Sequence, residues 1–126
     1  MDRETFQELV DRALQRLPEE FRNYLENIDV LVEDWPSLRQ LANARVRHRA
    51  GLLGLYEGVP VTGRGQGYNL VLPDKITIFQ KPIEAICRSA EEVELEVERV
   101  VRHEIGHYFG LDEGKLRNIE KGWQKK

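Results

Sequence analysis

The chain has 126 residues, of which 40% are hydrophobic and 33% charged, as is typical of one globular domain rather than a disordered chain. Its net charge of −3 argues against nucleic-acid binding, which requires a clustered basic surface. Cys87 is the only cysteine, so the chain forms neither an internal disulfide nor a thiolate metal cluster. The N-terminus lacks the apolar core of a signal peptide, and no apolar stretch is long enough to span a membrane. We therefore expect a single domain over residues 1–126, cytoplasmic and without a membrane partner.

Three helices are expected in the first half of the chain. The first covers residues 5–17, because Thr5 with Glu8 forms a capping box and the apolar residues that follow lie on one face. A second, shorter helix is expected over residues 19–25. The apolar spacing is again helical over residues 36–47.

Three short apolar runs predict strands over residues 28–32, 52–61 and 75–79, because they are rich in β-branched side chains. Between the last two lies TGRGQGYN, residues 62–69, with three glycines at alternate positions. A phosphate-binding loop needs a helix directly after such glycines, whereas LVLP follows here. We interpret this segment as a hairpin loop, and a flap over a cleft is the functional alternative.

The last third of the chain predicts a long helix. Ser89 with Glu92 forms a capping box at its start, valines then recur at helical spacing, and Gly110 is a natural stop. A short helix is expected after it, over residues 113–121. Helices at both ends around a small sheet predict the α+β class.

The end of this long helix carries HEIGHYFGLDE, residues 103–113. Positions four apart on a helix differ by about 40° in direction and about 6 Å in height, so His103 and His107 can converge on one metal ion. Glu104 points about 100° away, where a general base would sit beside the metal-bound water. The alternative is a plain amphipathic helix with a polar end. The helical context and the glycine that follows favour a zinc site.

A catalytic zinc needs a third protein ligand. His48 is the only other histidine, and its cationic neighbours in RVRHR disfavour a metal ion. Asp112 and Glu113 follow Gly110, which can take a left-handed conformation and turn the chain back towards the metal. Only one of these neighbouring side chains can readily face the metal, and local geometry leaves both open.

The sequence resembles the minimal zincin-like metallopeptidases, small bacterial proteins built around H-E-x-x-H-x-x-G-x-x-[DEH]. The residues that match this motif are His103, Glu104, His107, Gly110 and Glu113. Residues 72–83, LPDKITIFQKPI, also look like that family's strand followed by the start of a short helix. The resemblance covers much of residues 70–115, and its specific part is the motif.

The resemblance implies a minimal zincin-like fold, with a small mixed sheet and the motif on an active-site helix. It implies Zn²⁺ as cofactor and Glu113 as the third ligand. The usual residue at that position of the family is an aspartate, so Asp112 stays an alternative. The resemblance also implies an edge strand with which peptide substrates pair, formed by Ile76, Thr77, Ile78 and Phe79.

We therefore expect a zinc-dependent peptidase that acts on peptide or protein substrates. Glu104 would take a proton from the zinc-activated water and pass it to the leaving amine. Tyr56, Tyr68 and Tyr108 are candidates by residue type for stabilising the oxyanion, and Tyr68 is favoured because it ends the glycine loop. The alternative is a metal- or peptide-binding module with little or no turnover, which the shortness of the chain motivates. The sequence gives no indication of oligomeric state.

Overall fold

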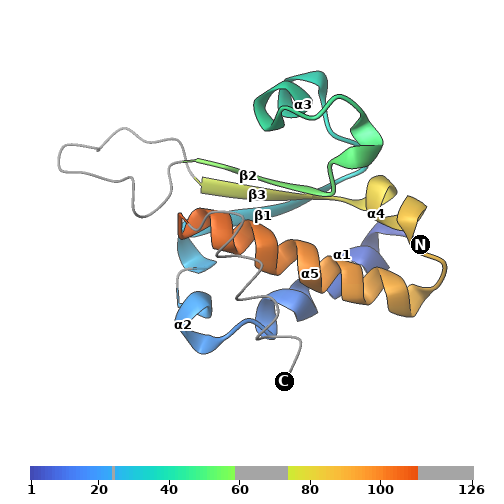
Figure 1. The fold of residues 1–126 in the computed structure, drawn as a ribbon. Coiled ribbons are helices and arrows are strands. Elements are labelled where there is room, and N and C mark those ends of the chain that lie inside the picture. The colour runs from blue at the N-terminus through green and yellow to red at the C-terminus, as the bar shows by residue number, and fades with distance from the viewer. Residues whose placement is uncertain (24, 59–73, 111–126) are drawn as a thin grey trace.

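The computed structural model describes residues 1–23, 25–58 and 74–110. Within them, three strands form one mixed sheet in the order β1-β3-β2 (Figure 1). Strand β3 (Asp74–Phe79) pairs in parallel with β1 (Ile28–Glu33) and antiparallel with β2 (Gly54–Glu57). A small mixed sheet with helices confirms the α+β class.

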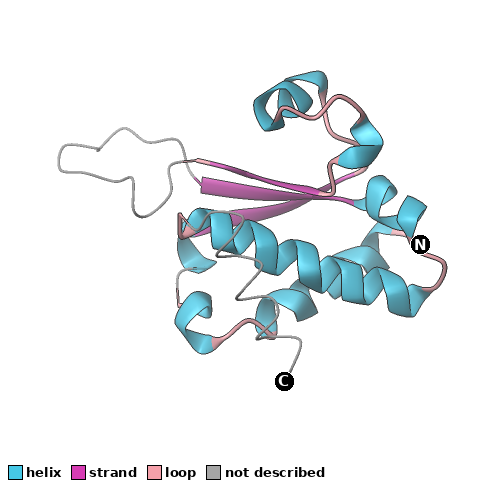
Figure 2. Ribbon diagram, in the orientation of Figure 1, coloured by secondary structure: helices cyan, strands magenta, loops and turns pink. Residues whose placement is uncertain are grey.

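Helices cover both faces of this sheet (Figures 1 and 2). Helices α1 (Arg3–Gln15) and α5 (Ala90–Tyr108) lie against one face, and α3 (Leu38–Ala44) lies over the other. The remaining helical segments are the short helices α2 (Glu19–Arg22) and α4 (Gln80–Ile86) and the 3-10 turns η1 (Leu25–Asn27) and η2 (Arg49–Gly51).

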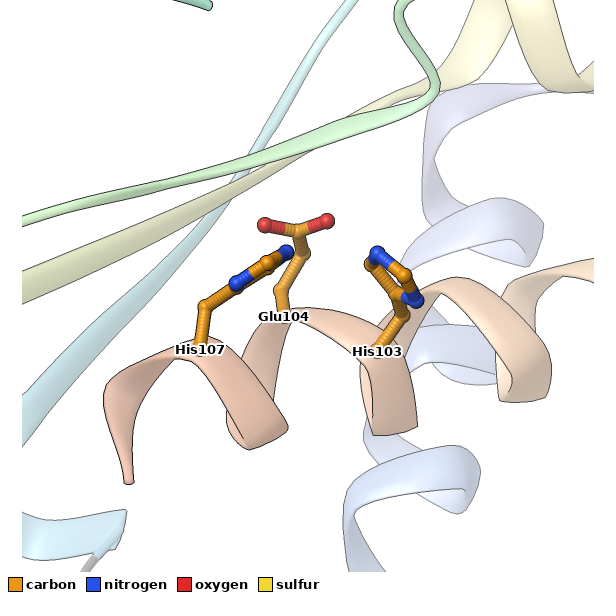
Figure 3. Close-up of side chains that lie close together, drawn as sticks. All are labelled: His103, Glu104 and His107. Carbon is orange, nitrogen blue, oxygen red and sulfur yellow. The ribbon is translucent and has the colours of Figure 1, made fainter. Parts of the chain in front are cut away.

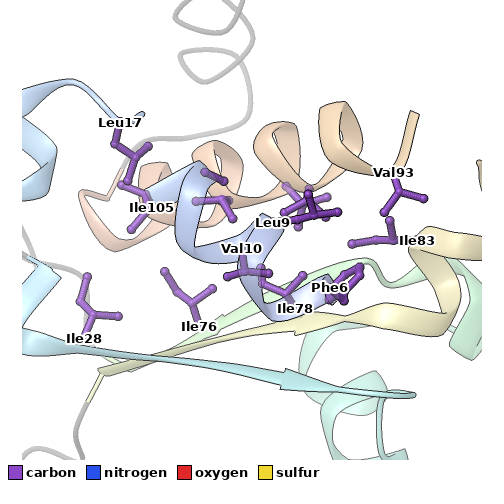
Figure 4. Packing of buried hydrophobic residues seen from close by; sticks show 14 of the residues in the cluster. Phe6, Leu9, Val10, Leu17, Ile28, Ile76, Ile78, Ile83, Val93 and Ile105 are labelled. Atoms are coloured by element: carbon purple, nitrogen blue, oxygen red, sulfur yellow. The ribbon is translucent and has the colours of Figure 1, made fainter. Parts of the chain in front are cut away.

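The alternation of side chains along β3 builds a core on each face of the sheet. Ile76 and Ile78 point towards α1 and α5 and are almost completely buried there (Figure 4). Phe79 points the other way and packs with Leu41 and Leu52 under α3. The larger core also takes the apolar faces of α1 and α5, which contribute Phe6, Leu9, Val10, Ala13, Val93, Val97, Val100, Val101 and Ile105.

Helix α1 begins two residues before the predicted start. Asp2 is its N-cap, and the Asp2 Oδ1 accepts a hydrogen bond of 2.7 Å from the backbone N–H of Thr5. Hydrogen bonding to Thr5 also lowers the pKa of the Asp2 carboxyl. The predicted cap at Thr5 is therefore wrong, because Asp2 caps the helix instead and Thr5 lies in its first turn.

The predicted start of the long helix is confirmed. The Ser89 Oγ accepts a hydrogen bond of 3.1 Å from the backbone N–H of Glu92. The Glu92 carboxylate accepts from the N–H of Arg88. Both acceptors thus serve N–H groups at the helix start, although the second lies one residue earlier than in an ideal capping box.

The helix predicted over residues 36–47 is shorter than expected, from Leu38 to Ala44. Ser37 and Gln40 form a reciprocal capping box at its start. Arg45 ends it in a left-handed conformation, with a φ of 58°. On either side of this turn, Ala44 and Val46 line a groove together with residues of β2.

The prediction that residues 76–79 form an edge strand is wrong. Strand β3 lies in the centre of the sheet, with its backbone paired to β1 on one side and to β2 on the other. Its N–H and C=O groups are used in these ladders and cannot pair with a peptide. Strand β2 is an edge of the sheet as far as the described residues show.

Two further predictions, the glycine loop over residues 62–69 and the helix over residues 113–121, lie outside the described residues. In the part of the chain that the structure describes, we find no helix that combines the length and the apolar character needed to cross a membrane.

Candidate metal centre

The last two turns of α5 place three polar side chains on the side of the helix that faces β2. His103 and His107 lie one turn apart, and Glu104 lies between them (Figure 3). One ligand atom from each side chain lies within 4.8 Å of the other two. The two imidazole rings are 4.8 Å apart between centroids and nearly perpendicular. The helical geometry expected from the sequence therefore brings these three groups together.

The glutamate of this cluster is more deeply buried than the two histidines. The side chain of Glu104 is buried, with 7% of its surface exposed, whereas both imidazoles are only partly buried. Two imidazoles on one helix turn are ligands that zinc accepts. They also stand at the C-terminal end of α5, where the helix dipole favours a cation. The donor set and its position thus fit a metal ion.

Strand β2 supplies the partner of the buried carboxylate. The Glu104 Oε1 accepts a hydrogen bond of 2.9 Å from the backbone N–H of Tyr56. This bond crosses from the edge strand to α5 and joins residues 48 positions apart. It orients the carboxylate along the strand.

A groove of about 440 Å³ opens beside these three groups. One wall is β2 and the residues just before it, and the other wall is the last part of α5. The turn after α3 adds an apolar rim. The lining residues are Ala44, Val46, Leu52, Gly54, Leu55, Tyr56, His103, Glu104 and His107. A ligand in this groove would touch the candidate metal ligands and β2 at once.

A sequence model of zincin-like metallopeptidases matches residues 25–123, which is most of the chain. The chain belongs to this family. The match runs from before β1 through the whole sheet and α5 to the residues that follow. A search of curated proteins finds no match.

The third ligand expected in this zincin-like protein lies outside the described residues. Asp112 and Glu113 both follow residue 110, where the description ends. Gly110 itself has a φ of 75°, and its N–H donates to the carbonyl of His107. The left-handed turn predicted at this glycine is therefore confirmed.

His48 does not join the cluster of possible ligands, which contains only His103, Glu104 and His107 among the described residues. It precedes η2 and is exposed. Arg49 beside it stacks on the ring of Trp35, with its guanidinium carbon 4.1 Å from the ring centroid. This part of the basic stretch thus helps to hold the segment after α3.

The three tyrosines named as oxyanion candidates have different places. Tyr68 lies outside the described residues. Tyr108 is 2% exposed and belongs to the large core, so its ring does not line the groove of this zincin-like site. Tyr56 lines the groove, but its hydroxyl donates a hydrogen bond of 2.7 Å to Oδ1 of the buried Asp74.

Sequence reasoning missed Gly54 and the backbone N–H of Tyr56. A backbone donor has no residue-type signal, and its partner lies 48 positions away. Gly54 did offer a signal, because a glycine inside a strand often marks a close approach of another element. The strand predicted over residues 52–61 contains this glycine, but the prediction gives it no such role.

A larger groove, of about 660 Å³, lies elsewhere on the sheet. Its lining includes Asp29, Glu33, Glu57, Arg39 and Lys75, and none of the three residues of the candidate metal centre. The candidate metal centre therefore does not lie in the larger groove. It is marked by the cluster of two histidines and a buried carboxylate on α5.

Proposed function

We propose that this zincin-like protein hydrolyses peptide bonds with the help of a zinc ion. His103 and His107 would hold the ion together with Glu113, or with Asp112 in its place. The observation that carries the proposal is the cluster of two histidines and a buried glutamate that faces a groove beside β2, an edge strand among the described residues. Zinc, when bound there, polarises the scissile carbonyl and lowers the pKa of a water molecule.

Glu104 acts as the general base in this proposal. Its carboxylate takes a proton from the attacking water and then gives a proton to the nitrogen of the leaving amine. The bond from Tyr56 N–H to Oε1 supports this role, because it orients the carboxylate before substrate binds. The low exposure of Glu104 supports it too, since fewer water molecules compete for the carboxylate.

The peptide would add a strand to β2. Gly54, Leu55 and Tyr56 of β2 line the groove together with the two histidines, and the Tyr56 N–H reaches across to Glu104 of α5. Backbone hydrogen bonds to such an edge hold any extended peptide, and the groove walls then select side chains. With only four residues in β2, the grip would be short.

Zinc titration and peptide cleavage test the proposal in wild type, Glu104→Gln and Glu94→Gln. Glu94 lies on the same helix but pairs with Arg12 of α1 and with Arg16 directly after it, so it serves as the matched control. We expect one zinc per chain in all three proteins. We expect Glu104→Gln to lose about 100-fold to 10,000-fold in kcat, while Glu94→Gln keeps it.

Two results would contradict the proposal. If wild type binds one zinc per chain but cuts nothing in a broad peptide library, the protein is a binding module rather than a peptidase. If His103→Ala binds zinc as tightly as wild type, the metal centre itself is wrongly placed.

A further inference from the structure

Strand β2 and helix α5 come unusually close at Gly54. A methyl group added to this glycine would lie 2.5 Å from Cγ1 of Val100, a distance at which one of the two must move. It would also lie 3.2 Å from Cγ of Glu104 and 3.4 Å from the carbonyl oxygen of Thr77. Residue 54 thus occupies a place where only a glycine fits without a shift of the strand or the helix.

The side chain of Glu104 uses the space that this glycine leaves. Its Cγ lies next to Gly54, and its Oε1 reaches the backbone N–H of Tyr56 two residues further along β2. The carboxylate arm therefore lies along the strand. A larger residue at position 54 would clash with Cγ of Glu104 and push β2 away from the helix.

We propose that Gly54 is a positioning residue for the general base. Because Gly54 has no side chain, β2 can lie close to α5. The Tyr56 N–H can then hold the Glu104 carboxylate in one orientation. The inference rests on the proposed role of Glu104. A hydrogen bond to a carboxylate is stronger than one between neutral groups, and it limits a side chain that otherwise has many rotamers.

A glycine can also be required for packing alone, and the two roles predict different results. A packing role predicts a loss of stability only. A positioning role predicts that the Tyr56 N–H loses its partner and that kcat falls, with small changes in KM and in zinc affinity. A misplacement near 1 Å can lower a rate by about 100-fold.

The experiment compares Gly54→Ala, Val100→Ala and the double variant Gly54→Ala/Val100→Ala with wild type. Val100→Ala removes the methyl group that overlaps most with the new side chain, so it should restore the close approach. Hydrogen exchange of the Tyr56 amide reports the bond without any need for metal or substrate. Glu104→Ala gives the exchange rate of this amide when its acceptor is missing.

We expect Gly54→Ala to speed exchange at Tyr56 by about fivefold or more, and to bring it close to the rate in Glu104→Ala. We expect kcat to fall by about tenfold to 100-fold with KM and zinc affinity within about threefold of wild type. The double variant should recover slow exchange and most of kcat relative to Val100→Ala.

Slow exchange at Tyr56 in folded Gly54→Ala would overturn the proposal. So would a double variant that exchanges as fast as Gly54→Ala while Val100→Ala stays slow. If Gly54→Ala does not fold, the comparison of the double variant with Val100→Ala decides instead. A wild type that cuts no peptide would remove the proposed function, but the exchange rates would still decide how Glu104 is positioned.

Discussion

Replacing Tyr56 with phenylalanine separates two roles that this residue can have. Its backbone N–H holds Glu104, and that bond survives any change of side chain. Its hydroxyl donates to Asp74 at the start of β3. If the hydroxyl instead stabilised the oxyanion, the loss of the hydroxyl would act on the reaction rather than on folding.

The size of the expected effect follows from the burial of Asp74. This side chain is 4% exposed, so water cannot easily replace the lost donor. Removing one partner of a buried hydrogen bond costs about 1–3 kcal/mol, and Tyr56→Phe should lower the free energy of unfolding by that amount. The ring contact with Tyr108, at 5.9 Å between centroids, is kept in this variant.

Urea unfolding of wild type, Tyr56→Phe, Asp74→Ala and the double variant measures the coupling between the two side chains. We expect a coupling energy of about 1 kcal/mol or more, and a change in kcat below about tenfold for Tyr56→Phe. A Tyr56→Phe variant with stability within about 0.5 kcal/mol of wild type and a kcat lowered by about 100-fold or more would instead assign the hydroxyl to the reaction.

Three further predictions concern the end of α5 and the single cysteine. Glu113→Ala should weaken zinc binding in a competition titration far more than Asp112→Ala, and the reverse ranking would make Asp112 the ligand. Gly110→Ala should lower the unfolding free energy by about 1 kcal/mol, because its φ of 75° suits glycine, and should weaken zinc binding by shifting the chain beyond it. Burial raises the pKa of the Cys87 thiol, and the nearby Glu96 and Glu92 carboxylates add to the shift. A raised pKa means less thiolate at pH 8, so iodoacetamide should modify Cys87 more slowly in the folded protein than in urea, and equal rates would contradict the shift.

The cluster on α5 could be predicted because it depends on one helix only. His103, Glu104 and His107 are related by the helical repeat, and the valines before them show that the segment is helical. The left-handed turn at Gly110 could also be predicted, since a glycine directly after a helix often adopts it. These features arise from contacts between residues close in the chain.

The start of α1 was missed for a local reason. The sequence offers two acceptors near it, the Asp2 carboxylate and the Thr5 hydroxyl, and both are common N-caps. In the structure the Thr5 N–H donates to Asp2, which makes Thr5 a residue of the first turn. Two competing caps a few residues apart cannot be ranked by residue type alone.

The strand order could not be predicted at all from the apolar runs. Residues 76–79 were expected at the sheet edge, yet β3 lies between β1 and β2. Burial on both faces does distinguish this strand, because Thr77 and Phe79 are as fully buried as Ile76 and Ile78. A run with no exposed face is typical of a central strand.

The sequence by itself therefore determined the helix that carries the site, the spacing of its histidines and glutamate, and the turn that follows. Only the tertiary structure decided which strand borders the site, and that Gly54 and the Tyr56 N–H face Glu104. The physical reason is the distance along the chain. A helical repeat relates neighbours through fixed backbone geometry, whereas the contact between β2 and α5 joins residues 48 positions apart and depends on how the whole core packs.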